Sequence, residues 1–202
     1  MLVLSSNGLS SPALREAVRT SMGDACTAAL VINADRVYKA ANYHVPRCLD
    51  ELAAIGLRAE IFDLDERPAE ALLQYDAVEF IGGNPFELLE TLRACHAEDV
   101  LCRLAAERTL IGWSAAAFVF GPTLALVNRY SPEMNTPPLA DLTALGLTET
   151  EVLPHYSRFL TRFDRFEEIC RDYESTRPAP VIRLNDGEGV IIRGGQTAVI
   201  RA

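Results

Sequence analysis

The stretch Thr109-Leu-Ile-Gly-Trp-Ser-Ala-Ala-Ala-Phe-Val-Phe-Gly-Pro122 decides how the rest of the chain is interpreted. Thr109 to Ile111 is typical of the end of a buried strand, and Ala115 to Phe120 is typical of an apolar helix. Ser114 stands alone between them, behind Gly112. This order predicts a nucleophile elbow, a tight strand-to-helix turn that exposes a hydroxyl at the edge of a sheet. Backbone N–H groups at the start of the helix would face the negative charge of a reacting carbonyl.

The stretch departs from the elbow pattern Gly-x-Ser-x-Gly at one position, where Ala116 replaces the second glycine. The extra methyl group falls where the turn is most crowded, and Trp113 adds a bulky side chain before the serine. Ordinary strand-turn-helix packing is therefore the competing interpretation. Ser114 can act as a nucleophile only if the chain also supplies a base, a carboxylate that orients the base, and donors for the oxyanion.

Composition and charge place the chain among ordinary globular proteins and exclude some functions. It has 202 residues, 49% hydrophobic and 23% charged, which suits a single domain spanning residues 1–202 with a sizeable core. The net charge of −9 argues against a broad nucleic-acid or anionic-membrane surface. The longest apolar run, Ala115 to Val127, is broken by Gly121-Pro122 and is too short to span a bilayer. We therefore expect neither a nucleic-acid nor a membrane partner.

The cysteines and histidines indicate neither a disulfide framework nor a metal site. The five cysteines show no Cys-x-x-Cys spacing, and the three histidines do not stand at zinc-ligand spacing. Scattered thiols with apolar neighbours are typical of a reducing compartment. The start, Met1 to Ser6, lacks the basic and long apolar regions of a signal peptide. The sequence therefore predicts a cytoplasmic protein without metal or cofactor, and a homodimer is compatible with it.

Short apolar runs alternate with helical patterns over the first 120 residues. Strands are expected at Leu2–Leu4, Thr27–Asn33, Arg58–Leu64, Asp76–Ile81 and Leu110–Gly112, and helices at Pro12–Met22, Val45–Ile55 and, in one or two pieces, Phe86–Arg103. This alternation favours βαβ units and a mainly parallel sheet. Gly82-Gly83-Asn84 and Ser114 would then lie at carboxyl ends of strands, the edge where open α/β sheets bind ligands.

The pattern is looser after Pro122. The expected segments are a strand at Leu124–Asn128, an irregular loop at Tyr130–Pro138, a short strand at Glu151–His155, a helix at Arg158–Tyr173, and antiparallel hairpins over Pro180–Ile200 around Asn185-Asp-Gly187 and Gly194-Gly195. Neither an internal repeat nor a linker divides the chain.

The candidates for chemistry are few. His155 is the histidine at an expected strand end, which makes it the candidate base for Ser114, against the alternative of a structural histidine. Four carboxylates compete for the role of the acid: Glu133, Asp141, Asp186 and Glu188. Asp186 is also explained by turn chemistry in Asn-Asp-Gly. Gly82-Gly83 could let a carbonyl approach a backbone N–H closely, or could simply form a tight turn.

Four segments, in this order, resemble the peptidase E (aspartyl dipeptidase) and cyanophycinase family of serine peptidases. They are Ile81-Gly-Gly-Asn84 with Phe86, Gly112-Trp-Ser-Ala-Ala-Ala-Phe-Val-Phe-Gly-Pro-Thr123, Leu153-Pro-His-Tyr-Ser157 and Val181-Ile-Arg-Leu-Asn-Asp-Gly187. The likeness spans nearly the whole chain. It implies a flavodoxin-like three-layer α/β sandwich, related to class I glutamine amidotransferases, with a mainly parallel central sheet and a C-terminal β-hairpin region.

The resemblance also implies roles for residues. Ser114 would be the nucleophile, His155 the general base and Asp186 the acid, with Glu133 as second choice. The oxyanion and substrate-binding positions would be Gly82, Gly83, Asn84, Ala115 and Arg165. The implied activity is hydrolysis of small peptides, including dipeptides with an N-terminal aspartate.

Selectivity for aspartate would require a cation near the substrate. The candidates are Arg129, Arg158, Arg162 and Arg165, of which Arg165 falls near a family-like arginine. Ala116 and the open identity of the acid leave an alternative, a catalytically impaired member of the same fold that binds a small ligand. A third hypothesis is an α/β-hydrolase esterase with the order Ser114, Asp141, His155, although few residues remain after Ser114 for the rest of that fold.

Overall fold

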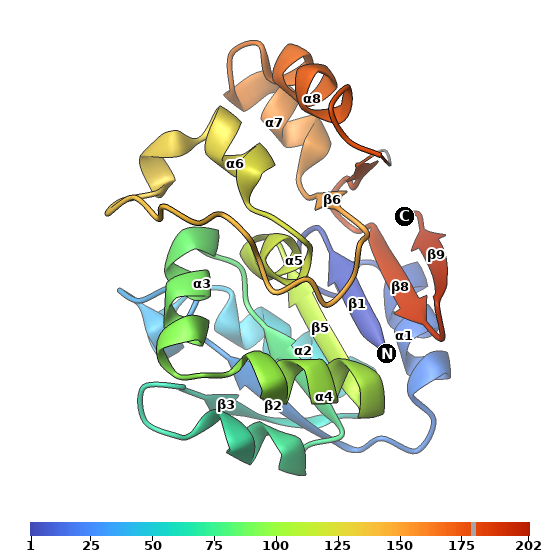
Figure 1. Ribbon diagram of the computed structural model, residues 1–202. Helices are drawn as coiled ribbons and strands as arrows, with labels where there is room; N and C mark the ends of the chain where they lie inside the picture. The colour runs from blue at the N-terminus through green and yellow to red at the C-terminus, as the bar shows by residue number, and fades with distance from the viewer. Residues whose placement is uncertain (179–180) are drawn as a thin grey trace.

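The computed structural model describes residues 1–178 and 181–202 and is built around a seven-stranded sheet with the order β3-β2-β4-β5-β1-β8-β9 (Figure 1). Its strands are β1 (Leu2–Ser5), β2 (Thr27–Val31), β3 (Arg58–Phe62), β4 (Ala77–Phe80), β5 (Thr109–Trp113), β8 (Gly189–Arg193) and β9 (Gln196–Ile200). The strands from β3 to β1 run parallel, and β8 joins β1 in antiparallel orientation. The central strands are buried on both faces, as in β4, where all four residues including Glu79 are buried, whereas the edge strands β3 and β9 are largely exposed.

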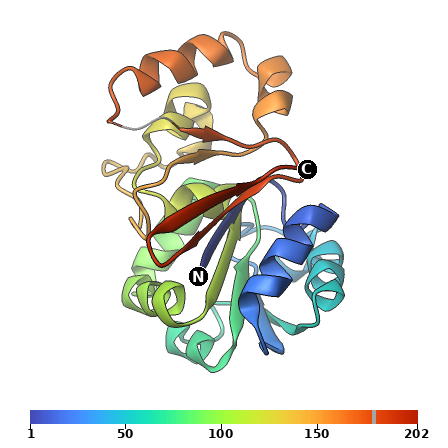
Figure 2. The same ribbon diagram turned by 90° about the vertical axis from the view of Figure 1, so that its right-hand side faces the viewer.

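Helices cover both faces of the sheet. They are α1 (Pro12–Met22), α2 (Val45–Ala54), α3 (Pro85–Ala94), α4 (Glu98–Glu107) and α5 (Ala115–Phe120), with the short 3₁₀ helices η1 (Lys39–Ala41) and η2 (Ala69–Gln74). Figure 2 shows α1 and α2 on one side of the sheet and α3 and α4 on the other. The expected three-layer α/β sandwich with a mainly parallel sheet and a C-terminal hairpin is confirmed.

The segments after α5 form a second region above the carboxyl ends of the parallel strands, which we call the upper lobe (residues 124–183; Figures 1 and 2). It contains α6 (Ala125–Tyr130), η3 (Pro132–Met134), β6 (Val152–Leu153), α7 (Tyr156–Arg162), α8 (Phe166–Glu174) and β7 (Ile182–Arg183). Strands β6 and β7 pair in parallel as a separate two-stranded sheet. Tyr130, Phe159, Phe163 and Phe166 pack together, with neighbouring ring centroids 5.0–5.9 Å apart.

The elements expected before Pro122 all form, and the 86–103 pattern is divided between α3 and α4. The expected strand at Leu124–Asn128 is wrong, because these residues belong to helix α6. Leu126, Val127 and Tyr130 supply its buried face at helical spacing, and an apolar run this short does not distinguish a strand from a helix.

Two further expectations in the upper lobe are wrong in detail. The single helix at 158–173 is two helices, separated by a turn in which Arg165 has a φ of 52°. Of the hairpins expected over 180–200, the described residues form β8–β9, through Gly194-Gly195, whereas β7 pairs with β6 instead. Pro180, where that prediction began, lies outside the described residues.

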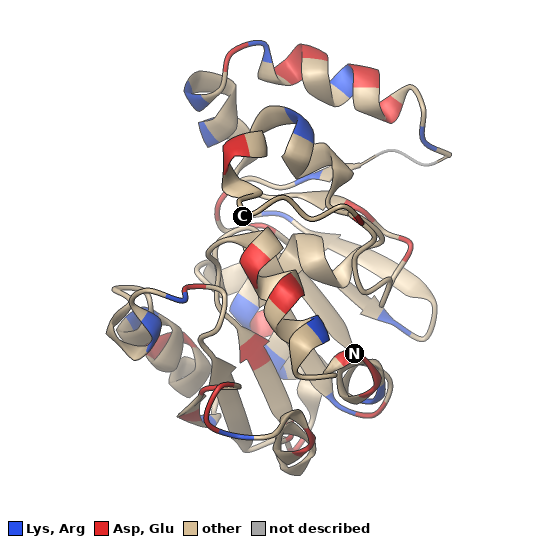
Figure 3. Ribbon diagram, turned by 60° about the vertical axis from the view of Figure 1, so that its left-hand side comes forward, with Lys and Arg blue, Asp and Glu red and all other residues tan. Residues whose placement is uncertain are grey.

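The charges of the two helices at the top of the upper lobe differ. Figure 3 shows acidic and basic residues interspersed on α8, whereas the charged residues of α7 are Arg158 and Arg162. Among the helices of the described chain, none combines the length and the hydropathy that crossing a membrane requires.

Candidate active site

Ser114 occupies the turn between β5 and α5 in the strained conformation that an elbow requires. Its φ of 52° and ψ of −112° lie in a region that costs a residue with a side chain on the order of 1–3 kcal/mol. Hydrogen bonds on either side hold the turn, since the Ser114 N–H donates to the Ser5 carbonyl (3.1 Å) and the Phe118 N–H donates to the Ser114 carbonyl (3.3 Å). The predicted strand-to-helix turn is therefore present.

Close packing around the turn explains its glycines. A Cβ on Gly112 would lie 2.5 Å from the Phe120 ring, and one on Gly82 would lie 2.4 Å from the Trp113 ring and 2.9 Å from the Ser114 Cβ. Ala116, by contrast, is fully buried within α5 while the turn keeps its shape. Replacing the second glycine of the elbow pattern by alanine does not prevent the turn from forming.

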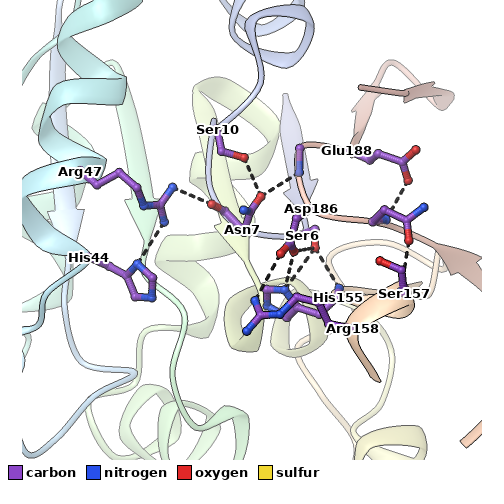
Figure 4. Close-up of polar contacts among 12 residues, drawn as sticks. Ser6, Asn7, Ser10, His44, Arg47, His155, Ser157, Arg158, Asp186 and Glu188 are labelled. Atoms are coloured by element: carbon purple, nitrogen blue, oxygen red, sulfur yellow. Dashed lines mark hydrogen bonds and ion pairs between the residues drawn. The ribbon is translucent and has the colours of Figure 1, made fainter. Parts of the chain in front are cut away.

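His155 lies between β6 and α7 and also has a left-handed backbone, with a φ of 57°. Its Nδ1 is 2.6 Å from Oδ1 of Asp186 (Figure 4). Because Nδ1 faces a carboxylate, the neutral ring carries its proton there and leaves the Nε2 lone pair free to accept a proton. Among the four candidate carboxylates, Asp186 is the one that contacts His155.

Ser6 joins these two residues from the end of β1 and was not predicted as a site residue. Its Oγ accepts a hydrogen bond from the His155 backbone N–H (2.8 Å) and donates one to Asp186 Oδ1 (2.8 Å). The Ser6 side chain is fully buried. The only signal in the sequence was the turn cluster Ser5-Ser-Asn-Gly8 at the end of the first strand.

Electrostatics favour a neutral His155 and an ionised Asp186. Burial lowers the pKa of His155, and its contact with Asp186 offsets part of that effect. Burial opposes ionisation of Asp186, but hydrogen bonds from Ser6 and His155 outweigh it, so that the carboxyl pKa falls below its ordinary value. These are the protonation states that a general base and its orienting carboxylate need.

A cavity of about 460 Å³ connects the predicted site residues. Ser114, His155, Gly82, Gly83 and Ala115 all line it. As the first residue of α5, Ala115 has a backbone N–H without an acceptor inside the helix. Two larger hollows, of about 690 and 780 Å³, contain no histidine among the described residues that line them.

The structure places the other predicted residues elsewhere. Asn84 does not line the cavity: its Oδ1 caps α3, and its Nδ2 donates to the Met134 carbonyl. Arg165 pairs with Glu168 on the outer side of the upper lobe. Glu133 is exposed and accepts a hydrogen bond from Ser131 rather than from His155.

The remaining carboxylate candidates are also engaged away from His155. Asp141 is exposed and pairs with Arg93. Glu188 accepts hydrogen bonds from the Asn185 backbone and from Arg201. Neither the esterase order with Asp141 nor an acid at Glu188 is supported by these contacts.

Another polar group borders the cavity from the side of α2. Arg47 donates to the Asn7 carbonyl (2.7 Å) and lies 3.4 Å from Nδ1 of His44 (Figure 4). It also pairs with Glu51 (2.5 Å). Behind it, Cys48, Glu51 and Glu79 bring potential metal-ligating atoms within 4.8 Å of one another. The Glu51 carboxylate is already held by Arg47 and the Leu9 N–H, so this cluster does not indicate a metal site.

A strained serine at a strand-to-helix turn, with a histidine–carboxylate pair at the same cavity, is the arrangement of α/β enzymes that place a nucleophile at the sheet edge. Comparison with known proteins identifies the family. The model of peptidase family S51 matches residues 1–200, and the chain belongs to this family. The expected membership among peptidase E-like proteins is confirmed.

Individual relatives agree with this assignment. An uncharacterised peptidase from Pasteurella multocida is 30% identical over 65% of the chain and 62% of its own length. One from Listeria monocytogenes is 27% identical over 74% of each protein. A peptidase E from Shewanella denitrificans is 30% identical over 74% of the chain and 64% of its own length. The chain therefore matches less than two thirds of the Pasteurella and Shewanella proteins.

Solved structures show the same fold. A crystal structure from Listeria monocytogenes EGD-e, whose assignment as a peptidase E is provisional, superposes with a TM-score of 0.80 at 23% identity and covers 100% of this chain and 98% of that one. A peptidase from an acI-B1 actinobacterium gives a TM-score of 0.66 at 17% identity, covering 98% and 86%. Family and relatives together support a peptidase as the class of enzyme.

Proposed function

We propose that the protein is a serine peptidase that hydrolyses small peptides, with Ser114 as nucleophile, His155 as general base and Asp186 as the carboxylate that orients it. The observation that supports this most directly is the strained Ser114 turn at the same cavity as a His155 ring bonded to Asp186. Each of the three comes from a different part of the chain. Packing alone does not require a serine with this backbone beside a buried histidine bonded to a half-buried aspartate.

In the proposed reaction, a peptide carbonyl lies against Ser114 with its oxygen facing the backbone N–H groups of Gly83 and Ala115. His155 Nε2 takes the hydroxyl proton as Oγ attacks, and the two N–H groups stabilise the resulting oxyanion, about 3 kcal/mol for each donor. His155 then protonates the leaving amine, and a water molecule, activated by the same base, hydrolyses the acyl-enzyme. Asp186 keeps the ring in the required tautomer throughout.

Small peptides fit the cavity better than a folded protein does, because about 460 Å³ accommodates only a few residues. Dipeptides with an N-terminal aspartate remain part of the proposal. Of the four arginines considered for this selectivity, Arg158 and Arg162 line the cavity. Arg129 packs over the Tyr173 ring, and Arg165 pairs with Glu168, so neither is placed to contact a substrate at Ser114.

One observation favours the alternative of a ligand-binding member without activity. Within the described residues, no hydrogen bond joins Ser114 to His155. Such bonds are often long before substrate binds, which is why the peptidase remains the better-supported function. The alternative predicts that a dipeptide raises the melting temperature of the protein without being hydrolysed.

Covalent labelling tests the proposal. A fluorophosphonate probe should label the native protein at Ser114, and labelling should disappear in Ser114→Ala and fall sharply in His155→Ala. Ser157→Ala is the matched control, because Ser157 is exposed on α7 and outside the cavity. Labelling that persists in Ser114→Ala would overturn the proposed nucleophile.

A further inference from the structure

The two walls of the cavity differ in chemistry. The side formed by α2 and by the loops after β1 and η1 is mainly polar and includes Asn7, Ser10, Asn42, His44 and Arg47, with the Tyr43 and Trp113 rings beside His44. The side formed by α5 and the upper lobe is mainly apolar and includes Phe118, Val127, Tyr130, Met134, Phe159 and Phe163, with His155, Arg158 and Arg162 beside them. We therefore expect a substrate to place an apolar group against the rings of the upper lobe.

The apolar wall is preformed by packed rings. Tyr130 from α6 lies 5.6 Å from Phe159 and 5.0 Å from Phe163, measured between ring centroids, and the two phenylalanines lie 5.1 Å apart. Phe166, which is 2% exposed, supports the same cluster from α8. Phe159 and Phe163 are only half-buried, so part of their apolar surface faces the cavity and would be covered by a bound side chain.

The position of His155 indicates which side of the scissile bond lies against the aromatic wall. The leaving nitrogen must reach His155 to be protonated, and Phe159 follows His155 by one helical turn, with ring centroids 5.5 Å apart. The residue that carries the leaving nitrogen therefore lies against the aromatic rings of the upper lobe. The acyl residue, on the other side of the bond, extends towards the polar wall.

The same face of α7 carries two arginines that line the cavity. Arg158 is 3.2 Å from Oδ2 of Asp186 and is engaged with that carboxylate. Arg162 forms no ion pair in the part of the chain that the structure describes, and it follows Arg158 by one turn. A free carboxylate on the leaving residue would find its partner in Arg162.

We propose, as an extension of the proposed function, that the substrate's leaving residue is C-terminal and carries an aromatic or large aliphatic side chain. Tyr130, Phe159 and Phe163 bind that side chain, and Arg162 binds the free α-carboxylate. The site is then selective at the carboxyl side of the scissile bond. Dipeptides ending in a large apolar residue are the substrate class.

Matched peptides test this selectivity. The set is Asp-Phe, Asp-Ala and Asp-Phe-amide, with Ala-Phe and Ala-Ala as a second pair. We expect kcat/KM for each Phe peptide to exceed that of its Ala partner by at least about tenfold, as the loss of a filled apolar contact usually costs. The amide should be hydrolysed several-fold more slowly than the free acid, because it lacks the charge that Arg162 binds.

Two variants test whether the aromatic wall and Arg162 cause the selectivity. Phe163→Ala should reduce the preference for Phe over Ala peptides, and Arg162→Gln should abolish the difference between acid and amide. Arg165→Gln is the control for charge, since Arg165 is exposed, three residues further along and outside the cavity. Circular dichroism and fluorophosphonate labelling of each variant show whether it is folded and whether its Ser114 turn is intact.

The outcomes separate this inference from the proposed function. If Ser114 is labelled but Phe and Ala peptides react equally, the selectivity is overturned and the peptidase proposal stands. If Ser114 is not labelled and nothing is hydrolysed, the peptidase proposal fails. The selectivity is then decided by thermal stabilisation, with a larger shift for Asp-Phe than for Asp-Ala supporting it and equal shifts overturning it.

Discussion

The sheet with its covering helices and the upper lobe contribute to the site by different means. The sheet region supplies Ser114, Gly82, Gly83 and Ala115, whose roles depend on backbone geometry and close packing. The upper lobe supplies His155 and the aromatic wall, whose roles depend on side chains. Asp186 lies in the connection between β7 of the lobe and β8 of the sheet. The proposed chemistry therefore requires the correct placement of both regions, while the proposed selectivity for the leaving residue depends mainly on the lobe.

Replacing the carboxylate at the junction should have the largest effect. Asp186→Asn leaves the shape of the site but removes the negative charge that orients His155, and we expect kcat to fall by on the order of 10³–10⁴. Glu133→Gln, the matched control for the second-choice acid, should leave kcat within about twofold, since Glu133 is exposed and bonded to Ser131. Steady-state hydrolysis of a dipeptide measures both. A severe loss in Glu133→Gln with an active Asp186→Asn would exchange the two roles.

Crowding the serine turn should have the next largest effect. A methyl group in Gly82→Ala would meet the Trp113 ring and the Ser114 Cβ, so the turn must shift. We expect about 1–3 kcal/mol of destabilisation and a loss of about 10² in kcat/KM from the displaced nucleophile. Gly194→Ala is the control for substitution of a glycine far from the cavity, because a Cβ there meets no atom within 4 Å. Its φ of 56° costs about 1–2 kcal/mol of strain, so this variant should lose stability but keep kcat/KM. Urea unfolding and dipeptide hydrolysis provide the two measurements.

The pH profile reports on His155. Its pKa lies below the ordinary 6.5, mainly because burial disfavours the charged ring. Since the base must be neutral, kcat/KM should be level near pH 7 and fall only on the acid side of 6.5, by about tenfold per pH unit below that pKa. Asp186→Asn removes a contact that raises the pKa of His155. The acid limb of the residual activity should therefore shift to lower pH. An acid limb centred above 6.5 in the native protein would contradict this.

The smallest effect is expected for substitution of Ser6, which positions His155 and Asp186. Ser6→Ala removes the hydrogen bond to Asp186 and the acceptor of the His155 N–H, and we expect kcat to fall about three- to tenfold, the size of a typical net hydrogen bond. KM should remain unchanged, because Ser6 is buried behind His155 and does not line the cavity. A purely structural role would instead lower stability and leave kcat unaltered in the folded fraction.

The first 120 residues could be predicted nearly element by element, because strand-like and helix-like patterns alternate there and each supports the assignment of the next. The helix Pro12–Met22 has the expected bounds, whereas the strand expected at Thr27–Asn33 ends at Val31. The upper lobe could not, since its elements are short. Val127 and its neighbours have the same apolar character in a strand as in a helix. The partition of 158–173 into two helices depends on tertiary packing of Phe163 and Phe166 that no local pattern records.

The site was predictable to the extent that its residues follow strands. Ser114, Gly82, Gly83, Ala115 and His155 meet at one cavity because parallel strands end at the same edge. Asn84 and Arg165 do not meet there: the first caps a helix, and the second faces outward.

Ser6 was missed because its place depends on strand order. Strand β1 lies between β5 and β8, with Ser5 opposite both Trp113 and Gly189. This order carries Ser6 to the pair formed by His155 and Asp186, and a single sequence does not specify which strands are neighbours.

The hydrogen bond from the His155 backbone to Ser6 has an evolutionary consequence. It anchors the histidine to the end of β1, although the residues that follow it belong to the upper lobe. Substitutions in α6, α7 and α8 can therefore remodel the walls of the cavity while His155 keeps its position relative to Ser114. If the proposed mechanism holds, a protein built this way can change its substrates through substitutions in one segment of the chain while its proposed catalytic residues stay in place.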